Sequence, residues 1–276
     1  MPNSGPSILA DVNDIIDEAL RLKDIGKRPF YKHKTSCQKL SKSPVGLNIG
    51  QLPQKIYEQL VLNWNTVKNH QLSEENWRFE KQRAIGKGKD KDKDKDKDKN
   101  VAEVALERAI VNIPKEIWPD ADSWMNQIPT SSGFMGPRVD KRRAIDLAYR
   151  REDGSYELIE LKVGESGGTP LFAAMEILQY GLLYVFAREH KEVSKFLKQD
   201  LELLRAECIH LKVLAPPVYY KGYDFAWLEK DINRGLVNFR SQRKFSFEMD
   251  FKFETLALTL TRSSPWVPDG PKRTSP

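Results

Sequence analysis

The sequence of 276 residues predicts an α/β fold, and three observations support that prediction. Apolar residues recur at helical spacing over 102–113, two strand-like runs flank a Glu-Asp-Gly turn at 152–154, and a nearly continuous apolar helix pattern follows at 171–187. Helix and strand patterns that alternate along one chain are typical of α/β proteins. We therefore expect an α/β core.

The first part of the chain, 1–86, is predicted to be a helical N-terminal region. Apolar residues have helical spacing at 7–22, and further helical patterns follow at about 53–68 and 73–84. We expect this region to be a smaller partner of a catalytic domain.

A basic segment lies between these helices and contains Phe30 and Tyr31. Such a mixture can hold phosphates and stack on a base, although an exposed loop kept soluble by its lysines explains it equally well. The candidate nucleic-acid-binding residues are Lys27, Arg28, Lys32 and Lys34.

Two stretches are predicted to lack a stable fold. Residues 87–100 alternate Lys with Asp and have almost no apolar residue to bury, so we expect a solvated linker or loop. The Pro- and Ser-rich stretch 263–276 is expected to be a disordered tail.

The catalytic domain is expected to span 101–262. Its first helix ends before Pro114, strands follow at about 142–150 and 155–163, and a buried helix follows at 171–187. No clear strand precedes the hairpin between Pro114 and Arg138, although 132–144 has room for a short one. The remaining patterns predict a helix through 193–204, a strand at 208–215, a helix at 223–240 and a one-sided strand at 244–253.

The turn between the two central strands determines which side chains meet. A two-residue turn at Asp153-Gly154 would face Asp146 against Leu161. A three-residue loop places Gly154 at its last position, where the common loop of this length needs a left-handed residue. That register pairs Asp146 with Glu160.

The same register separates the side chains of the hairpin by face. One face is expected to pack on the core, and the other is expected to present the acids and the lysine on an open surface. The polar face carries Ala144, Asp146, Ala148, Leu158, Glu160 and Lys162, and the apolar face carries Ile145, Leu147, Tyr149, Ile159, Leu161 and Val163.

Two carboxylates that face each other repel, so a site that keeps both ionised needs a cation. Oxygen ligands favour Mg²⁺ or Mn²⁺, and such an ion can polarise a phosphate oxygen and lower the pKa of a bound water. Lys162 is placed to orient the water or to stabilise developing charge. An ordinary solvated sheet face with a weak ion pair is the alternative.

The order of elements and residues resembles the PD-(D/E)XK nuclease superfamily over about 101–215. The resemblance rests on Asp146, Glu160 and Lys162, which match the two acids and the lysine of the motif; Ile145 stands where the proline would be. It implies a restriction-endonuclease-like αβββαβ core, hydrolysis of phosphodiester bonds, and divalent ions bound by Asp146 and Glu160.

Further acids and polar groups are secondary candidates. The resemblance implies another acid from the preceding helix, for which Glu103 is preferred over Glu107. Glu176, Gln179 and Tyr180 interrupt the apolar helix, where buried polar groups require partners. Tyr184 is interpreted as a core tyrosine, and either glutamate of the first helix can equally be a solvated side chain.

Composition limits the other classes. The two cysteines, Cys37 and Cys208, are far apart, which indicates neither a disulfide framework nor a zinc knuckle. No histidine pair has metal-ligand spacing, and no phosphate-binding loop or Ser-His-Asp order stands out. The N-terminus lacks signal-peptide features, and the 171–187 pattern contains Glu176, so we expect a cytoplasmic protein without a membrane segment.

The sequence therefore predicts a metal-dependent endonuclease. A net charge of +6 is compatible with nucleic acid, and the resemblance implies DNA as the substrate. The alternative is an inactive protein of the same fold that acts as a nucleic-acid-binding or scaffold module. The oligomeric state stays open, with a homodimer as one option because many double-strand cutters are dimers.

Overall fold

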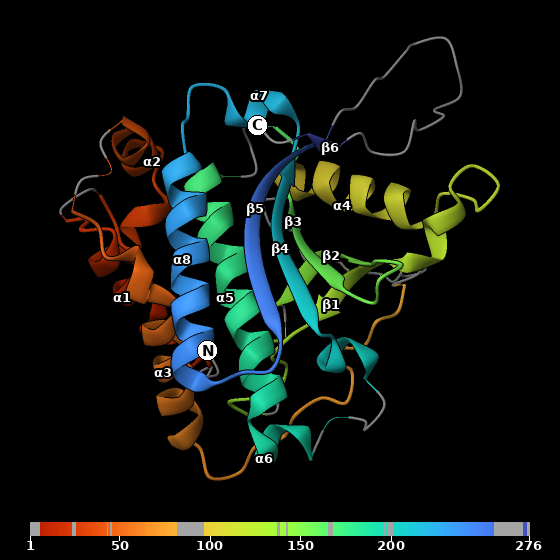
Figure 1. Ribbon diagram of the computed structural model, residues 1–276, viewed down its shortest axis with the longest axis horizontal. Coiled ribbons are helices and arrows are strands. Elements are labelled where there is room, and N and C mark those ends of the chain that lie inside the picture. Colours follow the sequence, from red (N-terminus) through yellow and green to blue (C-terminus); the bar gives the residue numbers. More distant parts are fainter. Residues whose placement is uncertain are drawn as a thin grey trace.

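A mixed β-sheet with helices on both faces forms the centre of the protein, as Figure 1 shows for the computed structural model. The α/β class is as predicted. The structure describes residues 6–23, 26–42, 44, 46–81, 97–136, 139–141, 143–164, 168–195, 197, 201–256 and 273–274.

The sheet keeps the order of the chain from β1 to β6. Neighbours β1, β2 and β3 are antiparallel, β3, β4 and β5 are parallel, and β6 is antiparallel to β5. Parallel neighbours need a crossover, which α5 and α8 supply. The strands are β1 (Trp124–Pro129), β2 (Ala144–Arg150), β3 (Tyr156–Leu161), β4 (Cys208–Ala215), β5 (Glu248–Leu256) and β6 (Arg273–Thr274).

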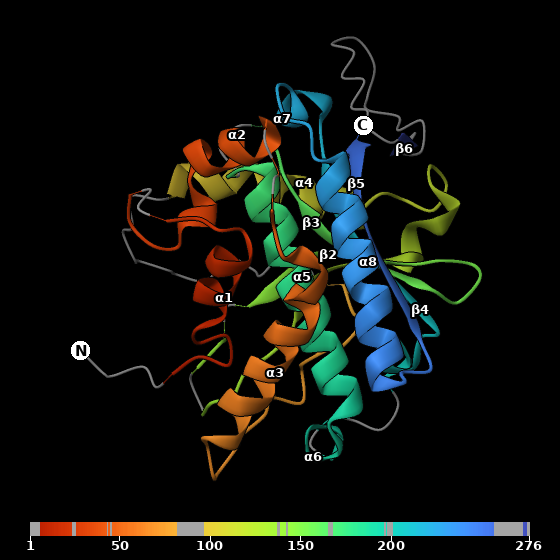
Figure 2. The same ribbon diagram turned by 60° about the vertical axis from the view of Figure 1, so that its left-hand side comes forward.

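The helices are layered around this sheet (Figures 1 and 2). Helices α5 and α8 cover one face, α1 and α3 pack outside them, and α4 lies on the other face. The helices are α1 (Val12–Ala19), α2 (Lys34–Lys42), α3 (Leu52–Asn65), α4 (Lys97–Val111), α5 (Pro170–Glu189), α6 (Lys191–Ser194), α7 (Pro217–Tyr220) and α8 (Ala226–Arg243), with 3-10 turns η1 (Phe30–Lys32), η2 (Ile49–Gln51), η3 (Pro119–Ser123) and η5 (Glu202–Arg205).

Helix α5 is apolar around most of its circumference, which suits its place between the sheet and the N-terminal helices. Thr169 caps it by accepting a hydrogen bond from the backbone N–H of Phe172, and Pro170 occupies its first turn. Among the described helices, α5 has the length and composition to cross a membrane, but 89% of its apolar window is buried in the protein. The prediction of a buried helix is confirmed. Helices α1 and α3 contribute to the same hydrophobic core.

The predicted hairpin register is confirmed. Leu147 pairs with Ile159 and Arg150 pairs with Tyr156, which is the register of a three-residue loop. Gly154 has the left-handed conformation that this loop requires, with a φ of 79°. Counting one position further places Asp146 opposite Glu160.

The prediction of an open polar face is wrong. Ala148 and Leu158 belong to the large core beneath α5, while Leu147 and Ile159 belong to a smaller core beneath α4. Both faces are buried because this chain supplies helices to each side of the sheet. Glu160 and Lys162 are therefore 3% and 5% exposed.

The sequence analysis does not predict β1, because this strand is short and ends in Pro129. It also lies upstream of 132–144, the segment in which a short strand was expected. Its ladder with β2 omits the pair of Gln127 and Asp146, and Gln127 has a φ of 51°. Such a break redirects side chains. This accounts for Ile145, which joins the core beneath α5 rather than the one beneath α4.

The predicted helix at 73–84 is wrong over its described part, 73–81, which is a turn followed by irregular chain. Its backbone bonds to the end of β1 and to the loop that follows: Trp77 N–H donates to Pro129 O at 2.7 Å, and Ser73 N–H donates to Ser132 O at 3.0 Å. These tertiary bonds replace helical ones, so local periodicity did not decide the structure.

The remaining boundaries differ in detail. The Lys/Asp linker was placed at 87–100, but 97–100 already belong to α4, and residues 87–96 lie outside the described part. The helical pattern at 193–204 gives only α6 and η5 where it is described. Of the predicted disordered tail, 273–274 form β6, and the rest lies outside the described residues.

Two glycine variants test the docking of segment 71–77. Gly133 and Gly154 have φ values of 84° and 79°, so alanine should cost each about 1 kcal/mol of backbone strain. At Gly133 a Cβ would also lie 2.0 Å from the Gln71 backbone oxygen, whereas at Gly154 it meets nothing within 4 Å. Gly133→Ala should therefore lose at least about 2 kcal/mol more than Gly154→Ala in urea unfolding, and equal losses would contradict the docking.

Candidate active site

The predicted site residues meet at the end of β3, between α4 and α5. Four elements contribute them: α4, β2, β3 with the residue that follows it, and α5. The acids are Glu103, Glu107, Asp146, Glu160 and Glu176, and the lysine is Lys162.

Lys162 connects α4, β3 and α5 through ion pairs with one acid from each. Its ammonium forms an ion pair with Glu160, and its Nζ lies 3.9 Å from Glu103 Oε2 and 4.0 Å from Glu176 Oε2. Burial opposes the positive charge, but Glu160 and Asp146 outweigh it and raise the pKa of Lys162. Lys162 is therefore charged and holds an acid from each side of the sheet.

Asp146 is fixed by the backbone of the neighbouring strand. Its Oδ2 accepts a hydrogen bond from Leu161 N–H at 2.9 Å, just beyond the regular ladder of β2 and β3. Its side chain is only partly exposed to solvent. The surrounding protein is the main cause that raises the pKa of Asp146 to about 6, and the charges of Glu176 and Glu103 add to it.

Both glutamates of α4 join the cluster, whereas the sequence favours Glu103 over Glu107. Glu107 is 2% exposed and its Oε2 accepts a hydrogen bond from Gln127 Nε2 at 2.6 Å. Burial and then Asp146 raise the pKa of Glu107 to about 7. Burial also raises the pKa of Glu103, whose Oε1 is buried without a hydrogen-bond partner.

Glu160 is a buried acid that lies close to other carboxylates. It is buried, and the carboxylates of Asp146 and Glu176 lie near it, so burial and repulsion raise its pKa well above the ordinary value. Five carboxylates surround one ammonium, which leaves an excess of negative charge whenever they are ionised. The site therefore favours protons or cations.

The polar residues of α5 divide into two groups. Glu176, Gln179 and Tyr180 line one 80 Å³ cavity together with Lys32 and Arg143. Gln179 is also satisfied inside the protein, since its Nε2 donates to Met175 O at 3.0 Å.

Tyr184 lies apart from this cavity. Its hydroxyl donates to Leu203 O at 2.8 Å, which confirms the prediction of a core tyrosine.

The basic N-terminal residues reach the site only in part. Lys32 lines the cavity of Glu176, and Lys34 lines a second cavity of 210 Å³ beside the start of α5. Arg28 is instead paired with Asp14 at 2.5 Å. Lys27 is exposed and lines neither cavity.

The hypothesis that Phe30 and Tyr31 stack on a base is wrong. The two side chains are 7% and 1% exposed, because η1 packs them against α5.

Two residues of the second cavity were missed in the sequence. Lys221 and Tyr219 line it, and the Tyr219 hydroxyl is buried without a hydrogen-bond partner. Burial is the main cause that raises the pKa of Tyr219, and the charges of Glu160 and Glu103 contribute. No sequence signal links α7 to the motif, because only the fold of the chain brings them together.

A buried triad on the opposite face was also missed. Lys212 Nζ lies 2.8 Å from Glu157 Oε1 and 2.9 Å from Glu254 Oε2, and all three residues line a 530 Å³ cavity. The available signal was Lys212 in the middle of a strand, between Leu211 and Val213.

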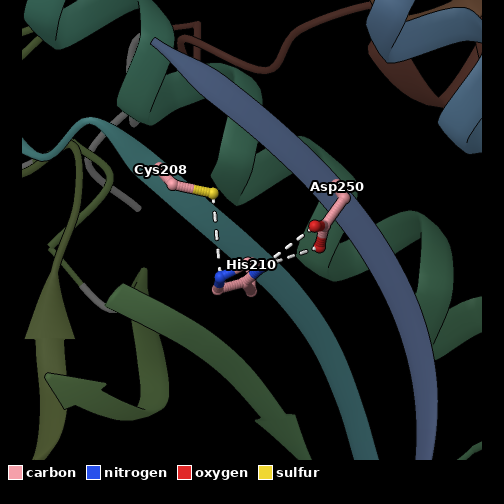
Figure 3. A group of neighbouring side chains, drawn as sticks. All are labelled: Cys208, His210 and Asp250. Carbon is pink, nitrogen blue, oxygen red and sulfur yellow. Dashed lines mark hydrogen bonds and ion pairs between the residues drawn. The ribbon is translucent and has the colours of Figure 1, made fainter. Parts of the chain in front are cut away.

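The acids around Lys162 are more widely spaced than ligands on one ion. Among the described residues, the group of His, Cys, Asp and Glu side chains whose ligand atoms all lie within 4.8 Å of one another is Cys208, His210 and Asp250 (Figure 3). Because Lys162 contacts three of the acids, a metal ion bound by the acid cluster must either displace the Lys162 ammonium or bind beside it.

Comparison with known proteins gives no relative: no protein family, no curated protein and no solved structure matches this chain. The roles of the site residues therefore stay predictions that rest on the geometry.

The raised pKa values predict how the metal-free protein responds to pH. In the unfolded chain Asp146 and Glu107 have pKa values of 3.8 and 4.5, and folding raises them to about 6 and about 7. The folded state therefore binds more protons, so stability is lost as pH rises from about 4 to about 7. In EDTA, the urea midpoint should fall over this range.

Asp146→Asn serves as the matched variant, because the amide oxygen can still accept from Leu161. It should flatten the loss of stability by up to about 3 kcal/mol, which corresponds to a pKa change of about two. Identical pH profiles for the variant and the unmodified protein would contradict the electrostatic account.

Proposed function

We propose that this protein is a divalent-metal-dependent nuclease of the PD-(D/E)XK type that hydrolyses phosphodiester bonds in DNA. The observation that carries the proposal is the group of five carboxylates around Lys162, of which Glu107 and Glu160 are buried and the other three are partly buried. The order α4, β1, β2, β3, α5, β4 supports it, because the superfamily is expected to have an αβββαβ core.

The chemical type of the donor atoms suits a hard divalent cation, and the acids would move closer together to share one ion. All are carboxylate oxygens, which Mg²⁺ and Mn²⁺ prefer, and among the described residues Lys162 is the cation that forms ion pairs with these acids. Glu103 Oε1 is buried without a hydrogen-bond partner, so this oxygen is free to act as a metal ligand. Asp146 and Glu160 would hold the ion, and Glu103 is placed to join them.

When bound, the ion would polarise a phosphate oxygen and lower the pKa of a water molecule. The chain's own groups complete the reaction. Lys162 supplies a fixed positive charge for the pentacovalent transition state. Glu107, whose pKa is about 7, is suited to accept a proton near neutral pH, and Gln127 holds its carboxylate in place.

The substrate would approach across the two small cavities beside the cluster. Lys32 and Arg143 border one of them, and Lys34 and Lys221 border the other. Cations on both sides of an acidic centre would hold the backbone phosphates on either side of the scissile bond.

Two variants separate metal binding from charge stabilisation. Asp146→Asn should abolish cleavage and weaken Mn²⁺ binding, because it removes a charged ligand. Lys162→Gln should bind Mn²⁺ at least as tightly, because the competing ammonium is gone, but it should cleave about a hundredfold more slowly. Mn²⁺ titration and single-turnover cleavage of labelled DNA measure both quantities.

Folding is the control for this pair, since Lys162 is buried; both variants must show the cooperative unfolding of the unmodified protein. Undiminished cleavage by either variant would refute the assignment. If the unmodified protein cleaves neither DNA nor RNA with Mg²⁺ or Mn²⁺, the scaffold alternative is favoured.

A lysine variant tests the approach of the substrate. Lys221→Ala should weaken DNA binding without changing the single-turnover rate at saturation, and it should reduce the slope of log K against log salt by about 1. Lys230→Ala, at an exposed position of α8, is the matched control with the same loss of charge. Equal effects of the two variants would show that Lys221 contacts no phosphate.

A further inference from the structure

We propose that Cys208 and His210 form a second metal site, independent of the acid cluster and selective for a soft ion such as Zn²⁺. The Cys208 sulfur and His210 Nε2 would bind the ion, and Asp250 would hold the histidine ring from behind. The site lies where β4 and β5 begin (Figure 3).

The separation of the two donor atoms fits a shared ion. Cys208 Sγ lies 3.7 Å from His210 Nε2. A tetrahedral zinc ion, with Zn–S of about 2.3 Å and Zn–N of about 2.0 Å, holds such ligands about 3.5 Å apart. Little movement is needed, because the two residues are two positions apart on one strand and their side chains therefore point to the same face.

The other nitrogen of the ring is already held. His210 Nδ1 lies 2.9 and 3.0 Å from the two carboxylate oxygens of Asp250, the residue paired with His210 across the parallel ladder. A carboxylate in this position keeps the proton on Nδ1 and leaves the Nε2 lone pair facing Cys208. Histidine ligands of metal ions are commonly oriented in this way.

The surrounding charge favours a cation over a reactive thiolate. The carboxylates of Asp250, Glu248 and Asp153 give the surroundings of Cys208 a negative charge, which Arg151 opposes. A Cys-His pair that acts as a nucleophile needs the opposite, an electropositive setting. A divalent ion reverses the balance, because a coordinated thiol loses its proton.

The site is accessible and separate from the acid cluster. The side chains of His210 and Asp250 are 19% and 53% exposed, and Cys208 is half-buried. His210 pairs with Glu157, three positions before Glu160 on β3, and lies on the opposite face of the sheet from Glu160. Open coordination positions would be filled by water.

Co²⁺ and Zn²⁺ titrations of the full chain test this site. Co²⁺ should produce the near-ultraviolet sulfur-to-metal charge-transfer band, and Zn²⁺ should abolish it by competition and protect one thiol from a disulfide reagent. Cys37→Ala should keep every signal, because Cys37 is fully buried elsewhere. Cys208→Ser should lose the band, His210→Gln should lose most of the affinity, and Asp250→Asn should weaken binding about 10- to 100-fold.

Asp146→Asn separates this site from the proposed nuclease centre, since it should leave the charge-transfer band and the Zn²⁺ affinity unchanged. A band that survives in Cys208→Ser would overturn the proposal, as would a thiol that Zn²⁺ does not protect. Rapid alkylation of Cys208 at neutral pH that depends on His210 would show a nucleophilic pair instead, and would overturn it equally.

Discussion

The buried ammonium of Lys162 lies between carboxylates from α4, β3 and α5, and the arrangement of these three elements depends on that contact. Without a cation, the buried Glu160 and the partly buried Glu103 and Glu176 would repel one another. Burial is the largest cause of the raised pKa values of four of the acids, and the single lysine offsets it only in part. The fold therefore holds a site that costs stability and that a second cation would stabilise.

The topology explains how distant residues reach this point. The antiparallel hairpin places Asp146 beside the end of β3, and its carboxylate replaces a ladder bond to Leu161. Helix α4 approaches from one face and α5 from the other, so that Glu107 and Glu176 border the same strand end (Figure 1). The N-terminal helices share the core of α5 and bring Lys32 and Lys34 to the two cavities beside it.

Local sequence signals were sufficient where a single residue fixed the geometry. Gly154 determined the loop length and thus the register of the hairpin, and the acids and Lys162 followed from it. Local sequence signals were insufficient where distant segments determine the surroundings of a side chain. The burial of Lys162 depends on helices on both faces, and β1 is recognisable only by its pairing with β2. Likewise, Asp250 meets His210 only because β4 and β5 are parallel neighbours.

Anomalous diffraction from crystals soaked in Mn²⁺ tests the central claim most directly, because it locates the cation without relying on turnover. The account predicts one peak in contact with the carboxylates of Asp146 and Glu160, accompanied by a movement of the Lys162 ammonium away from Glu160. An unchanged ion pair between Lys162 and Glu160, with no peak at this position in millimolar Mn²⁺, would contradict it.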